Sequence, residues 1–164
     1  MMCLEVGAGT NRSYRFAPRA PAGNMVVFLD IEPPGEDVKA CGMWVVADAE
    51  RLPFRPEAFD RVYASHVIEH LGSPASFLGE VYRVLKRGGV LELWTPNFLS
   101  ANARGDPGHL HVFNIFSLAR AGKATGFSIR LPVNAGSRLP KPLRRVLSIA
   151  INIFLDELHV IMRK

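Results

Sequence analysis

The chain has 164 residues, 48% of them hydrophobic, with a net charge of +5 and two cysteines. This length predicts one domain over residues 1–164, and the low cysteine count excludes a disulfide-rich secreted fold and favours reduced thiols in the cytoplasm. The longest apolar stretch, residues 146–155, is too short to span a bilayer, and the basic residues are not interleaved with aromatic ones, which disfavours nucleic acid as a partner.

The first half of the chain predicts four short strands. Continuous apolar runs of this kind are typical of strands whose two faces are both covered. Between the first two runs lie Pro18, Pro21 and Gly23, which leave room only for a shortened first crossover helix. The four strands are expected at residues 2–6, 25–30, 43–47 and 61–64.

The second half of the chain predicts helices alternating with strands. Apolar residues share one helical face over residues 75–85, and Gly88-Gly89 ends this helix. The alternation implies a mainly parallel α/β sheet. The remaining elements are expected as a strand at 90–95, a loop at 97–113, a helix at 115–123, a strand at 127–133, a loop at 134–142, a helix at 143–155 and a last strand at 158–162.

A turn with two glycines follows the first predicted strand, in the stretch of residues 4–10. Gly7 and Gly9 have no Cβ, so a ligand can approach the main chain closely there. A dinucleotide fingerprint needs a third glycine at position 12, which is arginine here. The nicotinamide interpretation is therefore weakened.

Acidic residues end three of the predicted strands. Because the carboxyl ends of parallel strands meet at one edge of a sheet, we expect Glu5, Asp30 and Asp48 around one ligand. Asp30 can accept both ribose hydroxyls, Ile31 offers an apolar face to a base, and Asp48 can accept from an exocyclic amine. Glu5 attracts a cationic group. The pattern indicates a nucleoside that carries positive charge.

These motifs resemble those of the class I, Rossmann-like S-adenosylmethionine-dependent methyltransferases, in particular compact members of methyltransferase type 11. The resemblance implies a mostly parallel seven-stranded sheet with an antiparallel last strand, and S-adenosylmethionine as the cofactor. The matching stretches are residues 4–10, 29–31, 46–54, 59–71 and 80–89.

The resemblance also implies a role for each cofactor-binding position. The methionine part would lie against Glu5, Gly7, Ala8 and Gly9, with the backbone of Ser65 near its amine. Asp30 would hold the ribose. The adenine would lie against Ile31, Asp48 and Ala49. The alternative for the two aspartates is a role as caps of turns, which Asp often provides.

The chain departs from the family pattern at two points. Asn11 replaces the third loop glycine, and asparagine tolerates the required backbone conformation better than most residues. Most members carry one or two helices before the first strand, and we expect these N-terminal helices to be missing. This departure has four possible explanations: the substrate pocket is open, a partner subunit completes it, the activity is lost, or the given sequence starts late.

Four histidines fall in two places that are expected to meet at the acceptor side. His66 and His70 follow the fourth strand with Glu69 between them, and His109 and His111 come from the later loop. In the first interpretation these residues are structural. In the second, His66, His70 or His111 is a general base. In the third, His66, Glu69, His70 and a loop histidine bind a divalent metal, as in similar plant small-RNA methyltransferases.

The resulting prediction is methyl transfer to an oxygen or nitrogen atom of a small molecule, such as a sugar or a lipid-linked metabolite. One alternative is a cofactor-binding subunit, or an inactive methyltransferase-like module, that needs a partner; another is a metal-assisted RNA methyltransferase. A homodimer is expected from the edge left exposed by missing helices. The predicted helix 143–155 allows contact with a membrane surface.

Overall fold

The computed structural model describes residues 1–9, 25–35, 43–130 and 156–164. The strands are β1 (Met2–Val6), β2 (Met25–Asp30), β3 (Met43–Val46), β4 (Phe59–Ser65), β5 (Leu85–Pro96), β6 (Ser128–Arg130) and β7 (Glu157–Arg163). The helices are α2 (Pro74–Val84), α3 (Ala101–Gly105) and α4 (Ile115–Thr125).

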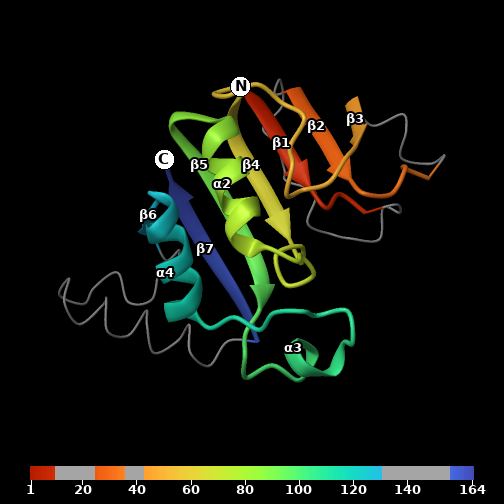
Figure 1. Cartoon of the computed structure of the whole chain (residues 1–164), viewed down its shortest axis with the longest axis vertical. Helices are drawn as coiled ribbons and strands as arrows, with labels where there is room; N and C mark the ends of the chain where they lie inside the picture. Colours follow the sequence, from red (N-terminus) through yellow and green to blue (C-terminus); the bar gives the residue numbers. More distant parts are fainter. Residues whose placement is uncertain (10–24, 36–42, 131–155) are drawn as a thin grey trace, which may run out of the picture.

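The strands form one seven-stranded sheet in the order β3-β2-β1-β4-β5-β7-β6 (Figure 1). Strands β1 to β5 pair in parallel, whereas β7 runs antiparallel to both β5 and β6. The predicted mostly parallel Rossmann-like sheet with an antiparallel last strand is therefore confirmed. The arrowheads of β1, β4 and β5 point to one edge of the sheet, where the segment with α3 lies (Figure 1).

The main core lies between the sheet and helices α2 and α4. Leu4, Val62 and Leu91 are opposite one another on β1, β4 and β5, and all three are fully buried. Phe77 and Leu78 of α2 are equally buried and belong to the same cluster. Because side chains alternate along a strand, the residues between these positions lie on the opposite face of the sheet.

Local sequence explains where the two long helices begin and end. The Ser73 hydroxyl accepts a hydrogen bond from the Ser76 backbone N–H, and Pro74 occupies the first turn of α2, where no backbone donor is needed. Asn114 and Ser117 form a capping box at the start of α4. Gly126 ends α4 in the left-handed conformation, with φ of 107°.

The fifth strand differs from the prediction because of tertiary pairing. β5 begins at Leu85 and runs through the two glycines, five residues before the expected start, and these glycines do not end the helix. Gly88 N–H donates to the Lys164 carbonyl and Lys164 N–H donates to the Gly89 carbonyl, each over 3.0 Å. The pairing with the end of the chain extends the strand, and the helix stops at Val84 instead.

Other predicted bounds are corrected by smaller amounts. β3 ends at Val46, β4 extends in both directions, and the predicted loop 97–113 contains the short helix α3. The predicted crossover helix, the loop 134–142 and the helix 143–155 lie outside the described residues, as do the last residues of the predicted strand 127–133. None of the helices that the structure describes has the length and apolar character needed to cross a membrane.

Candidate functional site

The turn after β1 brings a bare backbone to the edge of the sheet. Gly7 and Gly9 have φ angles of 70° and 73°, which side chains other than glycine rarely tolerate. The Gly7 N–H donates to the Leu29 carbonyl over 2.8 Å. A Cβ atom on Gly7 would lie 2.1 Å from Cγ2 of Val67, so a side chain at this position would force Val67 to move.

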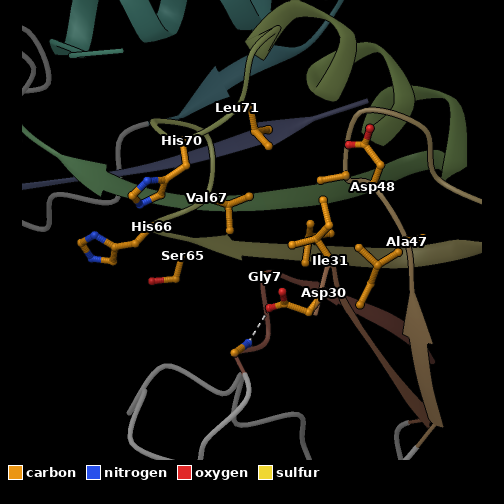
Figure 2. A pocket seen from close by; sticks show the side chains of 14 residues that line it. Gly7, Asp30, Ile31, Ala47, Asp48, Ser65, His66, Val67, His70 and Leu71 are labelled. Carbon is orange, nitrogen blue, oxygen red and sulfur yellow. Dashed lines mark hydrogen bonds between the residues drawn. The ribbon is translucent and has the colours of Figure 1, made fainter. Parts of the chain in front are cut away.

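Asp30 at the end of β2 holds this turn in place. Its Oδ2 accepts a 2.8 Å hydrogen bond from the Gly9 N–H, drawn as a dashed line in Figure 2. Its Oδ1 accepts from the Glu32 N–H over 3.2 Å. Each carboxylate oxygen has two acceptor positions, so Asp30 can still accept hydrogen bonds from a ligand.

A cavity of about 390 Å³ lies along the ends of β1, β2, β3 and β4. Its volume is in the range of roughly 300–1,000 Å³ that is typical of small-molecule sites. In Figure 2 the histidines lie at one end of the cavity, and Ala47 and Asp48 lie at the other. Seven of the predicted cofactor-binding residues line it: Gly7, Gly9, Asp30, Ile31, Asp48, Ala49 and Ser65. Glu5 and Ala8, the other two predicted positions, are not among the lining residues described.

At the Asp48 end, the aspartate caps a turn, which the sequence offered as an alternative to cofactor binding, and it also lines the cavity. Its Oδ1 accepts a 2.8 Å hydrogen bond from the Glu50 N–H and thereby closes a turn. The same residue lines the cavity, as does Ile31, which is 72% exposed. An exposed isoleucine beside an acid suits a ring with an apolar face and a polar edge.

Glu5 is a buried carboxyl group near the base of the glycine turn. Its Oε2 has no hydrogen-bond partner among the described residues. Burial raises the pKa of Glu5 from 4.5 to about 8. A cation bound nearby would reverse this shift, so the group is suited to an ammonium ligand. The hydroxyl of Ser65 is likewise buried without a partner among the described residues.

His66, directly after β4, has a left-handed backbone with φ of 53°, which is unusual for a residue with a side chain. Its Nε2 lies 2.7 Å from Oε1 of Glu157, and its Nδ1 lies 3.3 Å from Oε1 of Glu69. The interaction with Glu157, and then that with Glu69, raises the pKa of His66 to about 9. The imidazole is therefore charged at neutral pH, which does not suit the predicted role of His66 as a general base.

A second cavity, of about 540 Å³, meets the first at His66. Most of its lining residues belong to the segment that follows β5 and contains α3. His66 lines both cavities, so ligands in the two would approach each other beside this residue. The other lining residues are Pro96, Ala101, Gly105, Asp106, Pro107 and His109.

The tertiary structure brings His70 and His109 together and leaves His111 apart from the described cavities. His70 lines the first cavity and His109 the second, whereas His111 lines neither of these two described cavities. The predicted catalytic role of His111 thus receives no support from its position. His66 to His70 form a turn, not a helix, with the His70 N–H donating to the Val67 carbonyl.

Sequence reasoning did not single out Glu157. This acid precedes the last predicted strand with no motif around it, and its partner His66 is 91 residues away in the chain. In the sheet, Trp94 pairs with His159 and Pro96 pairs with Glu157. This register brings Glu157 to the end of β4. Only the strand order could have revealed this partner.

Comparison with known proteins relates this chain to methyltransferases. A family model described as "Methyltransferase domain" matches residues 4–93. The chain is 38% identical over 99 residues to the ubiquinone/menaquinone biosynthesis C-methyltransferase UbiE of Ruegeria sp. (strain TM1040), covering 54% of this chain and 39% of that protein. It is 30% identical over 96 residues to the malonyl-[acyl-carrier protein] O-methyltransferase of Salmonella typhimurium, covering 56% of this chain and 38% of that protein.

The chain therefore spans less than half of the length of these two relatives. A solved structure of a SAM-dependent methyltransferase from Archaeoglobus fulgidus superimposes with a TM-score of 0.69 at 20% identity, covering 99% of this chain and 86% of that one. This likeness supports the fold. The comparisons confirm the predicted resemblance to S-adenosylmethionine-dependent methyltransferases.

Proposed function

The chain belongs to the methyltransferase-domain family, and we propose that it transfers the methyl group of S-adenosylmethionine to an oxygen or nitrogen atom of a small-molecule acceptor. One observation carries the proposal: His66 lines both the cavity beside Gly7 and Asp30 and the second cavity after β5. A donor in the first cavity and an acceptor in the second would meet at this residue.

The chemistry of the first cavity suits the cofactor. Asp30 has acceptor positions left for ribose hydroxyls, and Ile31 and Asp48 suit the face and edge of an adenine. Glu5, whose Oε2 lacks a partner among the described residues, would attract the amino group of the methionine part. When bound, the cofactor supplies a methyl group already activated on a sulfonium sulfur.

The chain's own contribution to the reaction is chiefly position. Orientation of two reactants can supply up to about 7–11 kcal/mol without any acid or base. Asp106 lines the second cavity and offers a carboxylate to a hydroxyl or amine of the acceptor, such as a sugar or a lipid-linked metabolite. The curated relatives include a C-methyltransferase and an O-methyltransferase by name, so the acceptor atom needs a direct test.

Two measurements on the purified chain test the proposal. Calorimetry with S-adenosylhomocysteine is expected to give one binding site. Incubation with S-adenosylmethionine and a panel of phenols, quinols, amines and sugars is expected to form S-adenosylhomocysteine and a product methylated on oxygen or nitrogen. A methyl group on carbon would contradict the proposed acceptor atom. Binding without turnover on any acceptor would favour a cofactor-binding subunit that needs a partner, and absence of binding would refute both.

A further inference from the structure

One carboxylate and two imidazoles gather between the turn after β4 and the loop after β5. One candidate ligand atom from each of Glu69, His70 and His109 lies within 4.8 Å of the other two. We propose that these three residues bind a divalent transition-metal cation, with zinc as the best match. Two imidazole nitrogens and one carboxylate oxygen form a donor set that zinc accepts in proteins.

In both imidazoles the hydrogen bond that the structure describes is made by Nδ1. Nδ1 of His70 lies 2.9 Å from the Gly108 carbonyl oxygen, and Nδ1 of His109 lies 3.3 Å from the Ala103 carbonyl oxygen. A carbonyl oxygen can only accept, so Nδ1 carries the proton in both rings, and Nε2 of the neutral imidazole keeps its lone pair. Metal-binding histidines are typically oriented by such a bond from their other nitrogen.

The third ligand is a carboxylate with an unsatisfied oxygen. The side chain of Glu69 is 1% exposed. Its Oε2 accepts a 3.1 Å hydrogen bond from the Thr95 hydroxyl, whereas Oε1 has no hydrogen-bond partner among the described residues. Oε1 lies 3.3 Å from Nδ1 of His66. A buried carboxylate with so few hydrogen bonds is stabilised by positive charge beside it; the charged His66 supplies part of that charge, and a bound metal would add a cation that coordinates the carboxylate directly.

Backbone hydrogen bonds bring the two loops together before any metal binds. The Glu69 carbonyl accepts from the Leu110 N–H over 2.8 Å and from the His111 N–H over 3.0 Å. These bonds place His109 beside His70, with ring centroids 4.7 Å apart. Zinc–ligand bonds of about 2.0–2.1 Å require the ligand atoms to draw together to roughly 3.3–3.5 Å. The exposed side chain of His70 leaves room for this movement.

The site would keep a coordination position for a ligand from solution. Three protein ligands plus one open position is the arrangement of catalytic zinc sites. His70 lines the first cavity and His109 the second, so the cation would lie where the two approach each other. Asp106, whose Oδ2 lies 3.7 Å from Nε2 of His109, is the nearest further carboxylate to that nitrogen among the ion pairs described. Metal binding itself does not depend on the proposed methyl transfer.

Zinc binding to chelator-treated protein tests the site. Calorimetry with zinc alone is expected to show one equivalent bound to the wild type. His70→Gln and His109→Gln should each weaken binding at least tenfold, because each removes one ligand. His111→Gln is the matched control, since this histidine belongs to the same loop but not to the cluster, and it should change affinity less than twofold. The proposal is overturned if the wild type binds no zinc, or if His111→Gln weakens binding as much as His109→Gln.

Cobalt in place of zinc gives a test that needs no substitution. A tetrahedral site of nitrogen and oxygen ligands is expected to give strong visible absorption at one equivalent, and a spectrum like that of aqueous cobalt would overturn the proposal. Titration of each variant with S-adenosylhomocysteine separates the proposed zinc site from the proposed methyl transfer. A variant that loses zinc but keeps the nucleoside affects this site alone, whereas a wild type that binds zinc but no nucleoside refutes only the proposed methyl transfer.

Discussion

The backbone N–H of Gly9 donates a 2.8 Å hydrogen bond to the Oδ2 atom of Asp30, 21 residues further along the chain. The bond joins the turn after β1 to the end of β2, two strands that lie side by side in the sheet. The carboxylate that would hold the ribose thus also shapes the turn that would approach the rest of the cofactor. Loss of the Asp30 carboxylate should therefore affect both the ribose contact and the turn.

Asp30→Ala is expected to weaken binding of S-adenosylhomocysteine by about 10- to 100-fold, because hydrogen bonds to a charged group contribute about 1.5–3 kcal/mol each. Isothermal titration calorimetry measures the change. Glu32→Gln serves as the control: it removes a charge two residues away without touching the residues that line the cavity, and should leave the affinity nearly unchanged. Equal effects of the two substitutions would assign the loss to net charge.

Gly7→Ala is expected to lower the free energy of unfolding by at least about 2 kcal/mol, from left-handed strain and overpacking. The new Cβ would lie 2.1 Å from Cγ2 of Val67. Urea denaturation measures the loss, and adding Val67→Ala should restore part of it. Gly79→Ala is the matched control, because nothing lies within 4 Å of that Cβ in α2. The free energy of unfolding of that control should rise by about 0.5–1 kcal/mol. Unchanged stability of Gly7→Ala would contradict the described contact with Val67.

Glu5→Gln is expected to stabilise the protein in alkaline solution. Because the folded pKa of Glu5 is raised from 4.5 to about 8, its contribution to stability is complete below pH 4.5 and falls as the pH rises to about 8. A neutral glutamine avoids this loss, so we expect the free energy of unfolding to rise by about 1–3 kcal/mol at pH 8.5 and to change little at pH 4.5. Thermal unfolding at both pH values measures it. A gain that is the same at both would contradict the raised pKa.

Glu157→Gln is expected to lower the pKa of His66 from about 9 toward 6.5, because it removes the main partner of the charged imidazole. The sign for stability follows: the raised pKa stabilises the fold fully below pH 6.5, and this contribution is lost as the pH rises through 9. Titration of the His66 ring protons by NMR measures the pKa. Glu92→Gln, which alters the neighbour of His159 instead, should leave His66 unchanged.

The prediction from sequence was most successful where local pattern decides structure. β1 and β2 have the predicted bounds, and Gly7, Asp30 and Asp48 meet at one cavity. The reason is that a parallel sheet brings all strand carboxyl ends to one edge, whatever the loops between them do. β5 was predicted too short because Leu85 pairs with Phe59 and the two glycines pair with Lys164, and no local pattern reports such partners.

The order of apolar runs, glycines and acids along the chain determined the fold class, the family and most of the residues around the first cavity, because each follows from strand direction and backbone freedom. The tertiary structure alone decided the histidines. It paired His66 with Glu157 and placed His109, not His111, beside His70. The physical reason is that side-chain partners far apart in sequence depend on strand order and loop closure, which spacing along the chain does not encode.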